Sequence, residues 1–83
     1  MNIDKAPITC DINLLQDRYT MGEYQGVQNM LNLLRKESEN GSEIVIIEKY
    51  TNGQTSKEEQ RTQCSFSDKE KLEEWIKTKF PKL

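Results

Sequence analysis

Four consecutive apolar residues, Ile-Val-Ile-Ile at positions 44–47, constrain the fold of this chain more than any other stretch. They open a segment rich in β-branched residues that is typical of a β-strand. Because successive side chains of a strand point to opposite faces of the sheet, this strand is apolar on both faces. The chain has 83 residues, enough for one core. The run therefore predicts either helices on both sides of the sheet or an open apolar strip, which is typical of a partner-binding or self-association surface.

Asn52-Gly53 follows the apolar run and is a strong hairpin signal. The returning strand, residues 61–66, carries Thr62, Cys64 and Phe66 on one face. A two-residue turn at Asn52-Gly53 would place Ile47 opposite Glu58. A five-residue loop at 53–57 would instead pair Ile44 with Phe66, Ile46 with Cys64 and Tyr50 with Gln60, and such apolar cross-strand pairs contribute roughly 0.2 to 1 kcal/mol each. Both registers stay open, as does a long protruding ribbon with Asn-Gly at its tip.

Alternation of apolar residues predicts a half-buried strand at residues 7–16, with Ile8, Cys10, Ile12 and Leu14 on one face. A helix follows. It is expected to open with a capping box from Thr20 to Glu23 and a staple between Tyr19 and Tyr24, to include Gly22 and Gly26, and to stop at Asn40-Gly41. Its apolar stripe is Tyr24, Val27, Met30, Leu31 and Leu34.

The last helix is expected to open with a second capping box, from Ser67 to Glu70. Its apolar stripe is Leu72, Trp75, Ile76 and Phe80. The element order is then βαββα, which predicts a single α+β domain over residues 1–83, ordered from about residue 6 to 80. We expect two layers, a three-stranded mixed or antiparallel sheet on two helices. If the first two strands are adjacent they run parallel, and a fourth short strand at residues 15–19 is an alternative.

Composition excludes several classes of function. The chain has 12 basic and 14 acidic residues, so it has neither the basic stripe of a nucleic-acid binder nor the acidic excess of a DNA mimic. It has no histidine, nucleophile elbow, P-loop or dinucleotide fingerprint, so we expect no catalysis, no cofactor and no metal. Cys10 and Cys64 are expected to be free thiols that pack as small apolar groups.

The start of the chain has neither the basic residues nor the unbroken apolar run of a secretory signal peptide. No segment approaches the roughly 20 apolar residues of a membrane span. The sequence therefore predicts a cytoplasmic protein with no membrane contact.

The leading hypothesis is a non-catalytic protein-interaction module that binds a larger protein or a second copy of itself. In size and type it is similar to the small inhibitors and modulators of phages and mobile elements. The candidate partner-binding residues lie on the second strand, on the polar loop and on the outward amide face of the first helix: Val45, Ile47, Tyr50, Asn52, Gly53, Gln54, Lys57, Glu58, Glu59, Gln25, Asn29 and Asn32.

The alternative hypothesis is an RNA-binding module. The βαββα order resembles that of the KH domain, although the G-x-x-G loop between two helices, which clamps the nucleic-acid backbone in that family, is absent. Gly22 and Gly26 are spaced four apart and are expected inside one helix. The residues that would contact phosphates are the C-terminal lysines Lys69, Lys71, Lys77, Lys79 and Lys82, which alternate with acidic side chains.

Overall fold

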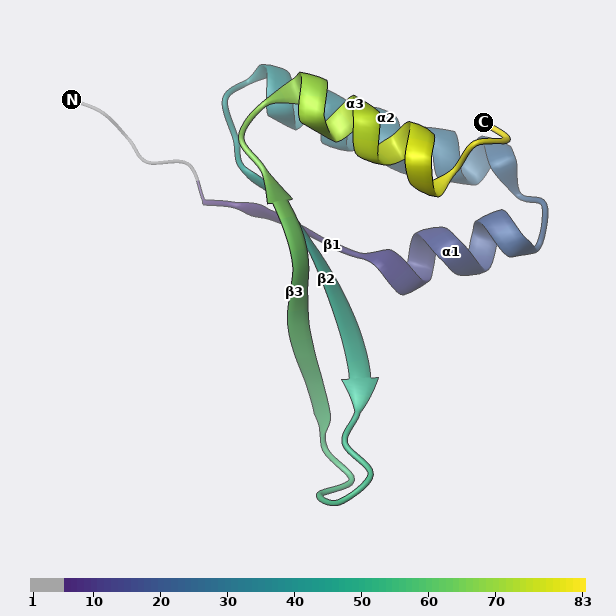
Figure 1. Ribbon diagram of the computed structural model, residues 1–83, viewed down its shortest axis with the longest axis vertical. Helices are drawn as coiled ribbons and strands as arrows, with labels where there is room; N and C mark the ends of the chain where they lie inside the picture. The colour runs from purple at the N-terminus through teal and green to yellow at the C-terminus, as the bar shows by residue number, and fades with distance from the viewer. Residues whose placement is uncertain (1–5) are drawn as a thin grey trace.

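Strand β2 (Ile44–Thr51) is the centre of the sheet in the computed structural model, which describes residues 6–83 (Figure 1). It pairs in parallel with β1 (Ile8–Asp11) and antiparallel with β3 (Glu58–Phe66), giving the order β1-β2-β3. The molecule is an α+β domain with a three-stranded mixed sheet, as predicted. The expected parallel pairing of the first two strands is confirmed.

Helix α1 (Ile12–Thr20) was not predicted and is the main correction to the expected order, which becomes βααββα. The alternation of apolar residues at 8–14 suggested one long strand, but the strand ends at Asp11. The Asp11 carboxylate caps the helix, since its Oδ1 accepts a hydrogen bond from the Asn13 N–H at 3.0 Å. The predicted fourth strand at residues 15–19 is wrong for the same reason, because these residues are helical.

Helix α2 (Tyr24–Glu39) begins later than the sequence suggested. Thr20 is the last residue of α1, and Glu23 occupies the N-cap of α2 without a side-chain capping bond, so the first predicted capping box is wrong. Gly22 lies between the two helices with φ of 81° and not inside a helix. The expected contact between Tyr19 and Tyr24 does form, with ring centroids 5.3 Å apart. The helix ends at Asn40, as expected.

Helix α3 (Lys69–Lys79) begins where the second capping signal placed it, but with a different cap. Asp68, not Ser67, is the N-cap, and its Oδ1 accepts from the Glu70 N–H at 2.9 Å. Leu72, Ile76 and the following Phe80 are buried, and Trp75 packs against them. The predicted apolar stripe of this helix is therefore confirmed.

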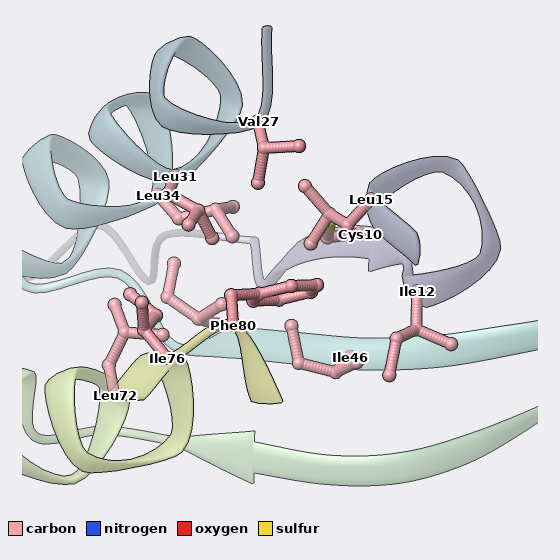
Figure 2. Close-up of a cluster of buried hydrophobic side chains, with 11 residues drawn as sticks. Cys10, Ile12, Leu15, Val27, Leu31, Leu34, Ile46, Leu72, Ile76 and Phe80 are labelled. Carbon is pink, nitrogen blue, oxygen red and sulfur yellow. The ribbon is translucent and has the colours of Figure 1, made fainter. Parts of the chain in front are cut away.

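The core contains side chains of all three helices and one face of the sheet. Figure 2 shows the ring of Phe80 in the middle of this cluster, with Leu31 and Leu34 of α2 on one side and Ile46 of β2 on the other. Ile44, Ile46 and Cys10 supply the sheet side of the core. All three helices therefore cover the same face, and the domain has two layers.

The second face of the apolar run is only partly open. Ile47 alternates with Ile46 and lies outside the core cluster, yet it is only 5% exposed. Val45 is half-buried, and its neighbours across the strands, Thr9 and Ser65, are exposed. The apolar strip predicted as one alternative for residues 44–47 therefore consists of Val45 alone, with small polar residues on both sides.

The hairpin follows the register of the five-residue loop in its inner part, and the two-residue turn is wrong, since Ile47 faces Thr62 and not Glu58. Ile44 pairs with Phe66 and Ile46 with Cys64, as the five-residue loop requires. A register shift between Ile46 and Ile47 then moves the outer pairs by one, so Tyr50 faces Glu59 and not Gln60. Because β1 pairs only with residues 44–47, residues 48–61 form a two-stranded ribbon that extends beyond the helices (Figure 1). We call residues 48–61 the outer arm.

Candidate functional site

Strand β1 forms one edge of the sheet, and within residues 6–83 no strand pairs with its open side. The N–H of Ile8 donates to Glu43 O at 2.8 Å, so the backbone groups of Ile8 and Cys10 point toward β2. Since these directions alternate along a strand, the N–H and C=O of Thr9 point to the open side. The edge of β1 can therefore accept another strand.

An apolar groove of about 270 Å³ lies beside this edge. Its walls are β1, Leu14 of α1, and Met30, Leu33 and Leu34 of α2. Leu14 is 54% exposed and Leu33 is 65% exposed, whereas Leu34 is buried. We call β1 together with Leu14, Met30 and Leu33 the β1 edge site. It combines an unpaired strand edge with two well-exposed leucines, a combination suited to binding an extended segment.

The two edges of the sheet differ in charge. The β3 edge carries Glu58, Glu59 and Arg61 and includes the register shift, and such features prevent unwanted strand pairing. In β1 the only charged residue is Asp11, whose carboxylate is engaged as the cap of α1. Among the described residues, the β1 edge is protected by its length of only four residues and by Pro7, which precedes it and has no N–H.

Side chains on one face of the outer arm form a network around Tyr50. The Tyr50 hydroxyl donates to Glu59 Oε2 at 3.0 Å, and the Arg61 guanidinium lies 5.2 Å from the centre of the Tyr50 ring. Arg61 also donates to Glu48 Oε1 at 2.6 Å. The pKa of Tyr50 is raised, first because Glu59 accepts its phenolic proton in a hydrogen bond and then because of the negative charge of Glu59. The network joins the two strands of the ribbon, with Arg61 ion-paired to Glu48 and Glu59 bound by the neutral Tyr50 and Asn52 side chains.

The tip of the outer arm is organised by Asn52 and not by Gly53. Asn52 Oδ1 accepts from the N–H groups of Gln54 and Thr55, at 2.8 and 3.3 Å, and its Nδ2 donates to Glu59 Oε1 at 3.3 Å. Gly53 does not have a positive φ, so the turn is not the tight type that Asn-Gly predicts. Gly53, Gln54, Lys57 and Glu58 are exposed at this tip, about as far from the β1 edge site as the hairpin allows (Figure 1).

The amide face of α2 is exposed but already internally bonded. Gln25 Nε2 donates to Asn29 Oδ1 at 3.0 Å, and Asn32 Oδ1 accepts from Arg35 Nη1 at 2.9 Å. Arg35 also forms an ion pair with Glu73, which joins α2 to α3. A partner that bound this face would have to replace these bonds.

The C-terminal lysines do not gather into one patch. At about 100° per helical residue, Lys69, Lys71, Lys77 and Lys79 point in different directions around α3. Lys69 is paired with Glu39 of α2, and this pairing lowers the pKa of Glu39, chiefly through the hydrogen bond. Lys82 lies beyond the helix, where its N–H donates to the Tyr19 hydroxyl at 2.9 Å. Gly22 lies between two helices, where a G-x-x-G loop would be, but Gln25 stands at the second glycine position.

The two cysteines are separated by a strand. Cys10 and Cys64 both pair with Ile46, from opposite sides, and both are free thiols, as expected. Burial raises the pKa of Cys10, with a smaller contribution from Asp11, and burial also raises the pKa of Cys64 against an opposing effect of Lys79. Raised thiol pKa values are typical of packing residues and not of nucleophiles.

Between residues 6 and 83, no group of three or more His, Cys, Asp or Glu side chains is arranged to hold a metal ion. No helix in that part of the chain has the length and apolar character needed to cross a membrane.

The predicted partner-binding residues therefore fall into three separate places. Tyr50, Asn52, Gly53, Gln54, Lys57, Glu58 and Glu59 lie on the outer arm, the amides lie on α2, and Val45 and Ile47 lie within the sheet. Ile47 has little surface to offer a partner. Leu14 and Leu33 were not selected from the sequence, although Leu33 lies off the apolar stripe of its helix, which is a signal that sequence reasoning could have used.

Comparison of the chain with protein-family models, with curated proteins and with solved structures finds no match.

Proposed function

We propose that this chain is a non-catalytic protein-interaction module that binds its partner through the β1 edge site. One observation carries the proposal, namely that the open edge of β1, whose one charged residue Asp11 caps α1, runs beside an apolar groove whose wall residues Leu14 and Leu33 are more than half exposed. Either feature alone is common on small proteins. Together they provide both components of strand addition, since backbone hydrogen bonds give affinity and side-chain pockets give selectivity.

The short length of β1 makes the groove necessary. Four residues with alternating directions offer only a few backbone hydrogen bonds. Each such bond contributes about 1 kcal/mol net, which is too little for a stable complex once the loss of translational and rotational freedom is included. Covering Leu14 and Leu33 adds about 25 cal/mol for each Å² of apolar surface buried. We therefore expect affinity to depend on these two leucines more than on the backbone.

The test is capture of partners from cells that produce the chain, using tagged wild type, Leu14→Glu and Leu33→Glu. We expect both variants to lose the partner, because each places a charge in the apolar groove. Gln63→Glu is the matched control, since it adds the same charge at an exposed position of β3. Circular dichroism and the unfolding midpoint establish that the variants remain folded. Retention of the partner by both leucine variants would contradict the proposal.

Salt dependence distinguishes this function from the RNA-binding alternative. Binding through an apolar groove should change little between about 0.05 and 0.5 M NaCl, whereas contacts to phosphates weaken steeply over that range. The RNA-binding alternative would be favoured if nuclease treatment released the bound material and if the double variant Lys77→Glu, Lys79→Glu bound it more weakly.

A further inference from the structure

We infer that the occupant of the β1 edge site is a second copy of this chain, whose β1 strand pairs antiparallel with the first about a twofold axis at Thr9. This inference rests on the proposed function and names the partner. The pairing joins two three-stranded sheets into one continuous sheet. Because the axis is perpendicular to the sheet, the helices of both copies lie on the same side of the joined sheet. The β1 edge site of one copy then faces the β1 edge site of the other.

The backbone groups on the open side of β1 are complementary to themselves. By alternation they belong to Thr9 and Asp11, and the C=O of Pro7, just before the strand, points the same way because the Ile8 N–H of the same planar peptide points to β2. Proline has no N–H, so Pro7 offers only its C=O. Asp11 is the N-cap of α1, so its C=O is used by the first turn of the helix and its N–H remains available. The open edge therefore offers an acceptor at Pro7, a donor and an acceptor at Thr9, and a donor at Asp11.

Reversing this order gives its complement. With Thr9 opposite Thr9 of the second copy, the two residues exchange both hydrogen bonds of an antiparallel pair. Each Asp11 N–H then faces the Pro7 C=O of the other copy, and neither the missing N–H nor the engaged C=O is required. A general extended peptide would leave an unpaired group opposite Pro7 and another opposite Asp11. The edge thus matches an antiparallel copy of itself better than it matches an arbitrary strand.

The side chains and charges agree with this arrangement. Leu14 and Leu33 stand out from the walls of the groove, so each copy supplies both projecting apolar groups and a groove to receive them. Among the described residues, the only charged one that lines the groove is Asp11. With the axis at Thr9, the two Asp11 residues lie at opposite ends of the paired segment, which limits their repulsion. A net charge of −2 on each chain adds little further repulsion.

The register is tested by disulfide formation between copies. Residues in a hydrogen-bonded antiparallel pair have Cα atoms about 5.5 Å apart, within the roughly 4.4 to 6.8 Å that a disulfide spans. Thr9→Cys should therefore form a covalent dimer with oxidised glutathione, and peptide mapping should find the link between the two substituted positions. Ser65→Cys is the matched control, because Ser65 is exposed in the same row of the sheet on the other edge strand and should not cross-link.

Sedimentation equilibrium of the full chain tests the interface itself. We expect a dimer whose dissociation constant rises at least tenfold in Leu33→Glu and in Thr9→Pro. Proline removes the outward N–H of Thr9 and leaves the pairing of β1 with β2 in place, because that N–H does not point to β2. Circular dichroism of each variant checks the fold.

Three outcomes would overturn the inference: a strict monomer up to about 1 mM, equal cross-linking of the Thr9→Cys and Ser65→Cys variants, or a dimer that is lost with Val45→Lys and kept with Leu33→Glu. None of these contradicts the proposed function, which fails only if the captured partner is retained by both leucine variants.

Discussion

Asn52 and Gly53 have different importance in the folded chain, although together they form one sequence signal. Both ends of the Asn52 amide are hydrogen bonded, to two backbone N–H groups of the tip and to Glu59. Gly53 has open space where a Cβ would be and no positive φ. The residue that shapes this turn is therefore the asparagine.

We predict that Asn52→Ala lowers the free energy of unfolding by about 1 kcal/mol, because the loop amides lose their acceptor. Gly53→Ala should stay within about 0.5 kcal/mol of wild type, since alanine can adopt the same backbone conformation. Urea unfolding followed by Trp75 fluorescence measures both. A larger loss for Gly53→Ala than for Asn52→Ala would show that the turn is of the tight type after all.

The Cys10 thiol is expected to make the free energy of unfolding depend on pH. Burial, and secondarily Asp11, raise the pKa of its thiol in the folded state. In the unfolded chain the thiol ionises at about pH 8.5, so above that pH the unfolded state binds fewer protons than the folded state. The stabilising contribution is fully present below the unfolded pKa and is lost as the pH rises through the folded pKa. We predict that the free energy of unfolding of wild type falls more steeply above about pH 8.5 than that of Cys10→Val, as measured by urea unfolding at several pH values. Parallel slopes would contradict the prediction.

At the scale of elements, one of the two predicted capping boxes located a helix start and the other did not. The signal at Ser67 to Glu70 found the start of α3 to within one residue, because Asp68 is an equally good cap next to Ser67. The signal at Thr20 to Glu23 failed because Thr20 already belongs to α1. A capping pattern identifies a set of residues that can cap, and it does not exclude a preceding helix that uses one of them.

Gly22 and Gly26 now belong to different elements, which gives a prediction. Gly22 has φ of 81°, and Gly22→Ala should lower the free energy of unfolding by about 1 to 2 kcal/mol because of the left-handed backbone conformation. Gly26 is inside α2, and a Cβ there would lie 3.1 Å from Nη1 of Arg18, the flexible end of a side chain. Gly26→Ala should therefore be neutral or stabilising by up to about 1 kcal/mol. Thermal and urea unfolding measure the stability of both variants. A Gly26→Ala variant less stable than Gly22→Ala would contradict the prediction.

The spacing of apolar residues predicted α2, α3 and the hairpin, but it missed α1, whose residues fit two different periods. The stripes of α2 and α3 and the inner hairpin pairs were predictable from apolar spacing alone. Residues 8–15 fit both an alternating strand and a strand followed by a helical turn, since Ile12 and Leu15 are three apart. The choice is made by tertiary packing, because Ile12 and Leu15 join the core only if the chain becomes helical after Asp11.

The candidate site could not be predicted for a related reason. The β1 edge site depends on strand order, which places β1 at an edge, and on α1, which brings Leu14 beside Leu33. Neither fact is local in sequence. The apolar run at 44–47 drew attention to itself because it is continuous, but three of its four residues are buried.

On the scale of the whole molecule, stability is distributed unevenly along the hairpin. The inner residues Ile44 and Ile46 are fully buried under all three helices. The outer arm is held by its own ladder, by the network around Tyr50 and by one bond from Asn13 Nδ2 to Lys49 O at 2.9 Å. A two-stranded ribbon without a covered face is only marginally stable by itself.

We therefore predict a gradient of amide hydrogen exchange along β2 and β3. Hydrogen-bonded amides paired across residues 44–47 should exchange only through global unfolding, whereas those near Tyr50 and Glu59 should exchange at least tenfold faster through local opening of the arm. Exchange followed by NMR measures this residue by residue, with the amides of α3 as the reference for global unfolding. Equal protection at Ile46 and Tyr50 would show that the hairpin opens as one unit. If the gradient is found, substitutions on the outer arm can be used to test binding there without unfolding the core, which separates the function of the arm from that of the β1 edge site.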